Sequence, residues 1–274
     1  MWRDPEERTE DPWIVERRTL CALEGDSVAA AAHLQRFGGG PEVGDTLRNS
    51  ARIRWALCWP GCHEAAVALL AAARQCMREW GSTSQCATMA LPAPGFVGVP
   101  DVWPHVAGAL RAAGFRPEPG EHLREALWGG WLRAERVTSP ERASDPRTAV
   151  PAEGLSLSRA VGRWWRGTDL RAVAEGKEIG CCAVRTDLTN GGEVPALAGW
   201  AQIADFEVNE AWRNRGIGTW LLRRAVDWMH LAGCDRVLLA VSEDAEGQRA
   251  GHLYQRFGWD VLAVTERAWV VDAP

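Results

Sequence analysis

The sequence predicts two α/β domains in tandem, each a mixed, mostly antiparallel sheet flanked by helices. A segment rich in proline and charge, residues 134–154, divides the chain of 274 residues almost in half and is typical of a linker. Three elements recur in the same order on both sides of this segment. We therefore expect one domain at 12–133 and a second at 155–274.

The first recurring element is a hairpin. In each half two apolar strands are joined by an acidic residue and a glycine, in LCALEGDSVAAAAHL and in RAVAEGKEIGCCAVR. Glycine accepts the positive φ that tight turns require. We therefore expect Glu24–Gly25 and Glu175–Gly176 to form the two turns.

The other recurring elements are helices that stop at glycine. A long amphipathic helix is expected at 64–81 and again at 216–233. A shorter helix follows in each half and ends before Gly114-Phe115 or Gly258-Trp259. The alternative is that these matches arise by chance, because many α/β chains place glycine after a helix.

Composition limits the partners. The chain is 46% hydrophobic and 24% charged, and its 31 basic and 36 acidic residues give a net charge of -5. Proteins that bind nucleic acid usually carry a basic surplus, so we expect no nucleic-acid partner and favour a cationic or amine-bearing one. A charged N-terminal segment and the lack of a long apolar run predict no signal peptide and no membrane partner, and hence a cytoplasmic protein.

The cysteines predict reduced thiols. None of the eight is part of a C-x-x-C pair, as a disulfide or zinc framework often is. Cys58, Cys62 and His63 come closest to a metal cluster, but no second ligand pair lies at a finger-like distance. We expect no metal.

The feature with the clearest chemistry is an Arg-x-x-Gly-x-Gly turn that leads from a strand into a helix. Gly216 and Gly218 have no Cβ, so a phosphate can approach the backbone closely. The amides and the dipole of the helix N-terminus attract an anion, and Arg213 and Arg215 add full charges. A Walker loop would require Gly-Lys-Ser/Thr, and a dinucleotide fingerprint would require a third glycine at Leu221. The turn therefore predicts a diphosphate site of another kind.

Two longer motifs resemble those of the GNAT acetyltransferases. The segment 208–218, VNEAWRNRGIG, resembles the pyrophosphate motif Val-x-Pro-x-x-Arg/Gln-x-x-Gly-x-Gly/Ala, with Glu210 at the usual proline. The segment 250–259, AGHLYQRFGW, is similar to the motif Ala-x-x-Leu-Tyr-x-x-x-Gly-Phe. The resemblance covers roughly residues 155 to 270 and implies that both halves are GNAT-like domains.

The resemblance implies acetyl-CoA as the acyl donor. It also implies that the fourth and fifth strands of the domain diverge, so that the pantetheine arm can pair with the exposed edge of the fourth strand. The implied donor-binding residues are Phe206, Val208, Arg213, Asn214, Arg215, Gly216, Ile217, Gly218 and Thr219.

Catalysis by direct transfer requires a base for the ammonium of the acceptor and an acid for the departing thiolate. The resemblance places the general acid at Tyr254, which is the single tyrosine of the chain. Alternation along the strand turns Asp205 and Glu207 away from the core face, which makes Asp205, then Glu207, the candidate base. The alternatives are two solvated carboxylates and a packed tyrosine. His252 is a further candidate acid or base.

The first half lacks these features. Aligned by its terminal glycine, its long helix has Glu64 and Ala66 at the positions of Gly216 and Gly218, and Leu110 stands in for Tyr254. A carboxylate there would repel a diphosphate, so we expect a degenerate copy. Residues 93–110, which include Trp103 and His105, are expected to form either an acceptor loop or a rigid loop packed on the first core.

The sequence therefore predicts an N-acetyltransferase that transfers an acetyl group to a primary amine of a small molecule or peptide terminus in a ternary complex. In architecture it resembles tandem acetyltransferases of bacterial secondary or thiol metabolism, and either a monomer or a homodimer is compatible with the sequence. The alternative is a non-catalytic module that binds acyl-CoA as a regulatory signal or scaffolds a partner.

Overall fold

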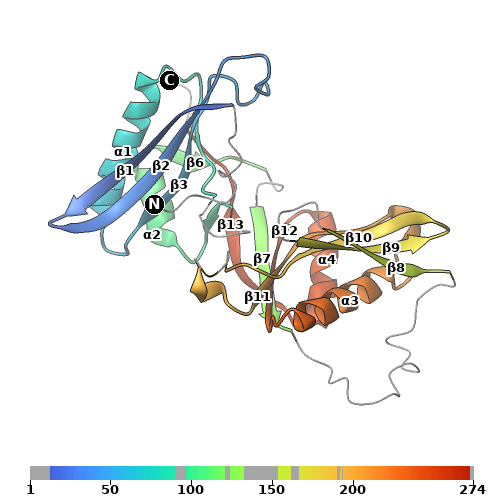
Figure 1. Ribbon diagram of the computed structural model, residues 1–274. Helices are drawn as coiled ribbons and strands as arrows, with labels where there is room; N and C mark the ends of the chain where they lie inside the picture. Colours follow the sequence, from blue (N-terminus) through green and yellow to red (C-terminus); the bar gives the residue numbers. More distant parts are fainter. Residues whose placement is uncertain are drawn as a thin grey trace. The chain divides into compact units, whose positions relative to one another are not determined.

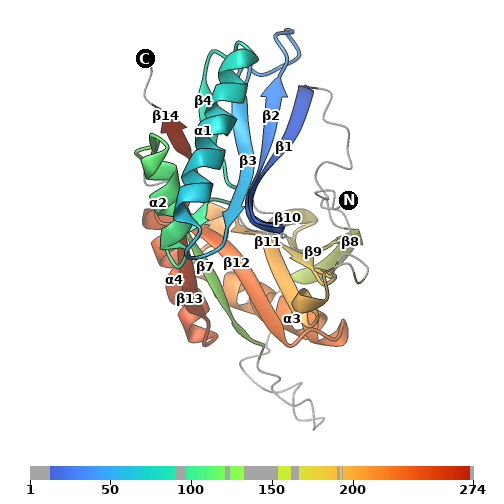
Figure 2. The same cartoon turned by 90° about the vertical axis from the view of Figure 1, so that its left-hand side faces the viewer.

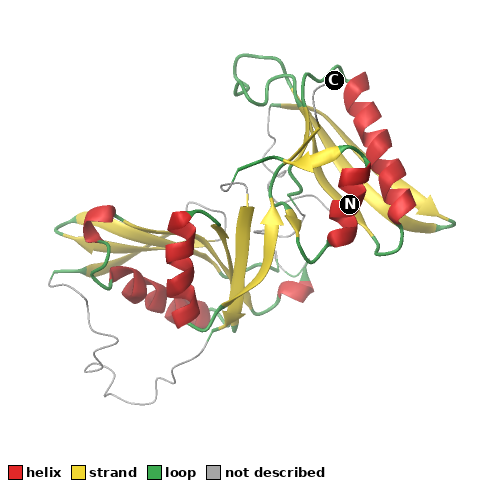
Figure 3. Cartoon of the chain, turned by 180° about the vertical axis from the view of Figure 1, so that it is seen from behind, coloured by secondary structure: helices red, strands yellow, loops and turns green. Residues whose placement is uncertain are grey.

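The structure is a computed structural model that describes residues 13–90, 97–120, 124–132, 154–161, 167–189, 192 and 194–271 (Figure 1). The chain divides into two compact units. Unit 1 comprises Met1–Ala126, Ser242–Asp244 and Ala263–Pro274, and unit 2 comprises Leu127–Val241 and Ala245–Leu262. Strands and helices occur in both units (Figure 3).

Unit 1 is built on a six-stranded sheet with the order β1-β2-β3-β4-β14-β6. The first three strands are antiparallel, and β4 runs parallel to β3. Helix α1 packs against β1, β2 and β3, and α2 packs against α1 (Figure 2). The elements of unit 1 are β1 (Ile14–Glu24), β2 (Ser27–Phe37), β3 (Ala51–Cys58), α1 (His63–Glu79), β4 (Gln85–Ala87), α2 (Pro104–Ala112), β6 (Phe115–Pro117) and β14 (Trp269–Val271).

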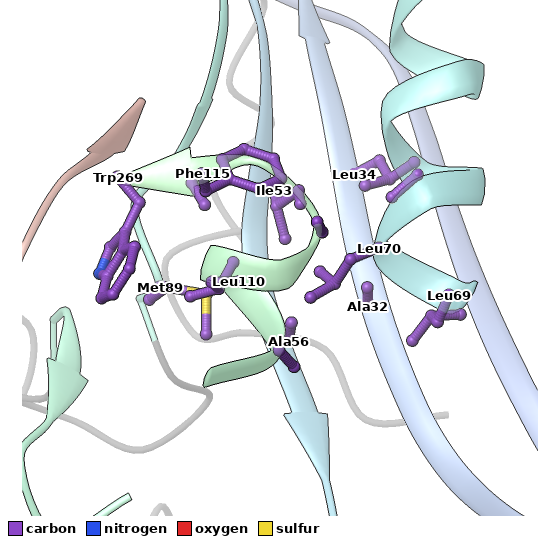
Figure 4. Packing of buried hydrophobic residues seen from close by; sticks show 14 of the residues in the cluster. Ala32, Leu34, Ile53, Ala56, Leu69, Leu70, Met89, Leu110, Phe115 and Trp269 are labelled. Atoms are coloured by element: carbon purple, nitrogen blue, oxygen red, sulfur yellow. The ribbon is translucent and has the colours of Figure 1, made fainter. Parts of the chain in front are cut away.

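The core of unit 1 lies between this sheet and its helices. Helix α1 buries positions spaced by three or four residues, which is the apolar stripe expected of an amphipathic helix. Leu34 and Ile53 of the sheet and Leu110 of α2 are buried in the same cluster (Figure 4). Trp269 of β14 is fully buried in this cluster, so a strand from the second half of the sequence is part of the core of unit 1.

Unit 2 contains most of the second sheet, whose order is β5-β13-β7-β12-β11-β10-β9-β8; its first strand, β5 (Val99–Pro100), belongs to unit 1. Strands β8 to β11 form an antiparallel series, and β12 runs parallel to β11. Helix α3 lies along β9, β10 and β11 (Figure 1). The elements of unit 2 are β7 (Arg124–Trp131), β8 (Ser156–Val161), β9 (Gly167–Ala174), β10 (Lys177–Arg185), β11 (Trp200–Val208), α3 (Ile217–Leu231), β12 (Arg236–Ser242), α4 (Ala245–Arg256) and β13 (Asp260–Glu266), with short 3-10 turns at Pro195–Leu197 and Glu210–Trp212.

Each half of the sequence gives its last strand to the sheet of the other half. Strand β14, from the end of the chain, lies between β4 and β6, whereas β7, from the first half, lies between β12 and β13. The units therefore differ from the contiguous domains expected at 12–133 and 155–274, because strand pairing and not chain order decides which strand completes a sheet. The expected linker at 134–154 lies, apart from Gly154, outside the described residues.

The two long helices and one of the two turns agree with the sequence. Helix α1 covers the stretch expected at 64–81, and α3 covers that expected at 216–233. The second hairpin turns at Glu175–Gly176, where both residues have positive φ.

The turn predicted at Glu24–Gly25 is wrong by one residue. Glu24 pairs with Ser27, so the turn consists of Gly25 and Asp26. Gly25, at φ +60, then occupies the first turn position, where this kind of two-residue hairpin requires the left-handed conformation. None of the described helices is long and apolar enough to cross a bilayer.

Candidate functional site

The centre of the candidate site is a split between two parallel strands of unit 2. Strands β11 and β12 pair only from Trp200↔Arg236 to Gln202↔Leu238, although β11 continues to Val208 and β12 continues to Ser242. On its other edge, β11 stays paired with β10 as far as Val208. From Ile203 onward one edge of β11 therefore has no paired strand among the described residues, which is the divergence that the resemblance implied.

The hydrogen-bonding groups at the end of this edge can be assigned from the register. The amide of Asn209 donates to the carbonyl of Ile179 on β10. Because successive backbone groups alternate in direction, the carbonyl of Val208 points toward the split. It accepts a hydrogen bond of 2.9 Å from Nε of Arg213. The edge thus offers backbone groups that a strand-like ligand can use.

The loop after β11 bends the chain into α3. The side chain of Asn209 caps a 3-10 turn by accepting from the amide of Ala211 at 3.1 Å. Asn214 and Gly216 then adopt left-handed φ angles of 62° and 81°. The left-handed φ of Gly216 suits glycine in particular, because a Cβ would be strained in this conformation.

The N-terminus of α3 is open. Its N-cap is Gly216, which provides no side chain to satisfy the first-turn amides of Ile217, Gly218 and Thr219. A Cβ on Gly218 would meet Phe206 at 3.5 Å and Val208 at 3.7 Å, which are ordinary contacts. The protein itself therefore leaves room at Gly218. The side chain of Ile217 is buried, so only its amide can reach a ligand.

Three guanidinium groups lie around this helix start. Arg213 contacts Val208, and Arg215 lies with its Cζ 5.0 Å from the ring of Trp212. Arg256, from the end of α4, donates to the hydroxyl of Thr219 at 3.3 Å. Arg256 is not among the residues expected from the sequence, because only the packing of α4 brings it to α3. Open amides beside arginines form a site suited to a phosphate or diphosphate.

Tyr254 is buried in an aromatic cluster at the split. Its ring lies 6.5 Å from Phe206, 5.9 Å from Trp128 and 5.9 Å from Trp259, measured between centroids. Burial raises the pKa of its hydroxyl well above the ordinary value, and the nearby Cys182 thiol raises it further. The phenol therefore stays protonated at neutral pH, as a proton donor must.

The two candidate carboxylates lie on the other face of β11. Asp205 and Glu207 are exposed, whereas Ala204, Phe206 and Val208 are partly buried, so the predicted alternation is confirmed. Since Phe206 packs toward Tyr254 and α3, the carboxylates are on the face away from the phenol. The structure thus places the candidate base and acid on opposite faces of the strand that borders the split.

The remaining candidates take no part in this arrangement. His252 is exposed on α4. Trp103 is the N-cap of α2 and packs on the core of unit 1, and His105 lies within the helix. The described part of residues 93–110 therefore belongs to a helix start and a short strand, which favours the structural interpretation. Residues 91–96 lie outside the described residues.

Unit 1 has a shorter counterpart of this strand pair, with a different loop. Strand β3 pairs with the whole of β4, up to Ile53↔Ala87, and then continues beyond it to Cys58. Residues 59–61 connect β3 to the N-cap of α1, whereas residues 209–215 connect β11 to α3. The connection in unit 1, residues 59–61, contains no arginine.

The expected alignment of Glu64 with Gly216 is wrong. Cys62 is the N-cap of α1 and so corresponds to Gly216, because α1 has 17 residues and α3 has 15. The thiol of Cys62 contacts the carboxylate of Glu24 at 3.7 Å. Its pKa is raised by desolvation and by the charge of Glu24. A thiol and a carboxylate thus lie at the start of α1, where unit 2 has arginines.

Residues 131–259 match the sequence model of the Acetyltransferase (GNAT) family. The chain contains a GNAT acetyltransferase domain. The match includes the split strand, the loop into α3 and Tyr254 with its neighbours Phe206 and Trp259, and members of the family use acetyl-CoA. Comparison with curated proteins found no match.

Solved structures share the fold of this GNAT-containing chain. A tandem GNAT protein from the clavulanic acid biosynthesis pathway has a TM-score of 0.64 at 18% identity, with coverage of 97% of this chain and 86% of that chain. A GCN5-related N-acetyltransferase from Sphaerobacter thermophilus has a TM-score of 0.56 at 16% identity, with coverage of 97% and 83%.

A third structure covers a larger protein. The glucosamine N-acetyltransferase region of a fungal multi-domain GH3 beta-N-acetylglucosaminidase has a TM-score of 0.60 at 16% identity and covers 93% of this chain but 33% of that chain. At such identities the likeness establishes the GNAT-like fold.

Proposed function

We propose that the protein is an N-acetyltransferase that transfers the acetyl group of acetyl-CoA to a primary amine of a small molecule or peptide terminus. The observation that carries this proposal is the combination, in one unit, of the β11–β12 split, the open start of α3 and the buried, protonated Tyr254. The GNAT match over 131–259 supports acyl transfer as the class of reaction.

The residues of the site fit the donor at two places. The amides of Ile217, Gly218 and Thr219, with Arg213 and Arg215, would hold the diphosphate, and Gly216 and Asn214 shape the turn that presents them. The backbone of Phe206 and Val208 would pair with the amide groups of the pantetheine arm, as an added strand does. When bound, acetyl-CoA supplies an activated acyl group as a thioester.

The protein would manage two protons during transfer. An alkyl ammonium is protonated at neutral pH, so Asp205 or Glu207 would accept its proton, directly or through water, before the nitrogen attacks. The nitrogen attacks the thioester carbonyl to form the C–N bond, and as the C–S bond then breaks Tyr254 would donate a proton to the departing sulfur. The second proton of the nitrogen, lost as the amide forms, would restore the phenol directly or through water. The placement of acid and base on opposite faces of β11 lets the acceptor approach from the face away from Tyr254.

The acceptor is proposed to be a small amine. Two of the solved structures that share the fold are a protein of the clavulanic acid biosynthesis pathway and a glucosamine N-acetyltransferase region, which concern small molecules. The net charge of -5 and the exposed carboxylates on β11 favour a cationic acceptor over nucleic acid. We propose that the enzyme acts as a monomer or homodimer without a metal.

Unit 1 is proposed to be a degenerate copy that binds no acyl donor. Its connection from β3 to α1 is four residues shorter than the connection from β11 to α3 and lacks arginine, and Leu110 of α2 is packed in the hydrophobic core. A diphosphate there would face the carboxylate of Glu24 without a compensating guanidinium in the connection. Its contribution would then be structural.

The proposal is tested by free-thiol release from acetyl-CoA in the presence of a panel of amino sugars, diamines and peptides with free N-termini. We expect release with at least one amine, and a loss of about 100-fold in Tyr254→Phe with donor binding retained. Calorimetry with acetyl-CoA is the parallel measurement. Tight binding without release for every amine would instead support the regulatory, non-catalytic alternative.

A further inference from the structure

We propose that Trp128 is a positioning residue for Tyr254, so that the last strand of the first half supplies one side chain to the acetyltransferase site of unit 2. This inference rests on the proposed function for the catalytic role of Tyr254. The other residues of the site lie between Asp205 and Trp259 in the sequence. Trp128 instead precedes residues 134–154 in the sequence, and it belongs to unit 2 as part of β7.

Strand β7 holds Trp128 in place through two glycines that follow it. A Cβ on Gly129 would lie 2.6 Å from Leu262 Cδ1 and 3.0 Å from the carbonyl of Val237, on β13 and β12. A Cβ on Gly130 would lie 2.9 Å from the ring of Trp259. Since such distances exclude a side chain, β7 approaches its neighbours more closely than any other residue type would allow.

Helix α4 makes matching room for the indole. A Cβ on Gly251 would lie 2.9 Å from Cζ2 of Trp128. Gly251 and Tyr254 are three residues apart and therefore share a face of α4. The indole occupies the space left by Gly251, and its ring centre lies 5.9 Å from that of Tyr254 at an angle of 57°. Trp128 is itself buried, so this contact is shielded from water.

The aromatic contacts restrict the phenol from more than one direction. Trp259 stacks on Tyr254 at 21°, whereas Trp128 and Phe206 meet it at 57°. Tilted and offset pairs of this kind are favourable beyond the area that they bury. Phe206 lies on the split strand, so the cluster connects the phenol to the place where the thioester would lie. Loss of Trp128 would leave a void beside the ring and allow other rotamers.

If Trp128 positions Tyr254, the loss of kcat on its replacement depends on Tyr254, whereas a purely structural role predicts a loss that is the same with and without Tyr254. A double-mutant cycle distinguishes these two patterns. We expect Trp128→Leu to lower kcat about tenfold or more with KM for acetyl-CoA changed less than about twofold, because Trp128 lies outside the diphosphate cradle. Trp128→Phe should recover most of the rate. In a Tyr254→Phe background, Trp128→Leu should cost less than about twofold, since the group that it positions is gone.

Two matched controls separate positioning from general destabilisation. Trp269→Leu makes the same change at the buried tryptophan of the other exchanged strand, in unit 1. Trp131→Leu replaces an exposed tryptophan, which lies three residues after Trp128 on the same strand, β7. Both should leave kcat within about twofold of wild type when measured on folded protein.

A spectroscopic readout does not depend on activity. Because Tyr254 is the only tyrosine, full-length protein labelled at the tyrosine ring gives NMR signals from this residue alone. Trp128→Leu should shift the ring signals toward those of free tyrosine and average its two edges by faster flipping, whereas Trp128→Phe should retain most of the wild-type shift. Trp269→Leu should leave the signals unchanged.

The outcomes distinguish the two proposals. An equal loss of kcat from Trp128→Leu with and without Tyr254, in an active enzyme, would overturn the positioning role and leave the proposed function intact. Unchanged tyrosine signals in Trp128→Leu would overturn it whether or not the enzyme is active. Absence of thiol release in wild type would overturn the proposed function. In that event the tyrosine signals still decide whether Trp128 fixes the ring.

Discussion

Val208 accepts a hydrogen bond from the Nε of Arg213, so the loop that would hold the diphosphate folds back onto the strand edge that would hold pantetheine. When acetyl-CoA binds, the Arg213 guanidinium would instead contact a phosphate, and the Val208 carbonyl would instead accept from an amide of the pantetheine arm. Binding would therefore exchange one hydrogen bond for two that are made to the ligand.

Replacement of this arginine should weaken donor binding. Arg213→Ala removes a charge-assisted phosphate contact worth about 1.5–3 kcal/mol, partly offset by the freed Val208 carbonyl, so we expect Kd for acetyl-CoA to rise roughly tenfold. Calorimetry at two salt concentrations checks this, and the salt dependence should also become weaker. Arg224→Ala, which removes an arginine paired with Asp227 further along α3, should leave Kd unchanged. Equal effects of both changes would count against the cradle.

The start of α3 should not tolerate a carboxylate. Gly216→Glu places a negative charge at the amides proposed for the diphosphate and strains a residue at φ +81. We expect Kd for acetyl-CoA to rise at least about 100-fold, with about 1–2 kcal/mol of lost stability.

Gly233 provides a matched control at the other end of the same helix. It also has φ +81, and a Cβ there would meet no atom within 4 Å. Gly233→Glu should show a similar loss of stability by urea unfolding and an unchanged Kd. If Gly216→Glu binds acetyl-CoA as wild type does, the assignment of the loop fails.

The base can be identified from pH–rate profiles. Asp205→Asn should lower kcat about 10²-fold if Asp205 takes the proton, and Glu207→Gln should then have a smaller effect, because both side chains are exposed but occupy different positions along the split. The acidic limb of the profile should disappear in the variant that lacks the base. Should both variants keep the wild-type profile, water alone would be the proton acceptor.

Tyr254 should make the protein less stable at alkaline pH. Its pKa in the folded state lies above the value of about 10 in the unfolded chain, so the unfolded state releases the proton first as the pH rises. Below a pH of about 10 the hydroxyl is protonated in both the folded and the unfolded state, so it does not make stability depend on pH. Above this pH the free energy of unfolding falls by about 1.4 kcal/mol per pH unit. Tyr254→Phe lacks this contribution.

Urea unfolding at about pH 9 and about pH 11 gives the comparison. The loss of stability between the two pH values should be larger in wild type than in Tyr254→Phe by about 1.4 kcal/mol. The cysteines ionise in both proteins and cancel in this difference. Identical losses would show that the phenol is not buried from water as the structure indicates.

The exchanged strand β14 should stabilise unit 1. Trp269→Ala removes a fully buried indole from the core that contains Leu110 and Ile53, so we expect a loss of about 3–5 kcal/mol. Hydrogen exchange measured by segment should show the loss in β2 and β3 of unit 1. Faster exchange confined to β9 and β10 would contradict the assignment of β14 to the first sheet.

Local features of the site could be predicted because they depend on residues that are close in the sequence. The alternation of Asp205 and Glu207 with Phe206 and Val208, and the glycine that opens α3, follow from strand periodicity and backbone sterics. The start of α1 could not be predicted in the same way. Its N-cap shifted to Cys62 because helix length is decided by packing on the sheet as well as by local sequence.

The sequence by itself determined the elements of this protein and the chemistry of its loop: hairpins, helices ending in glycine, arginines beside open amides and a single tyrosine. Only the tertiary structure decided which strand completes which sheet, and so brought Trp128 and Arg256 to residues far from them in the chain. The physical reason is that a strand satisfies its backbone with whichever neighbour is adjacent in space, and no local pattern records that choice.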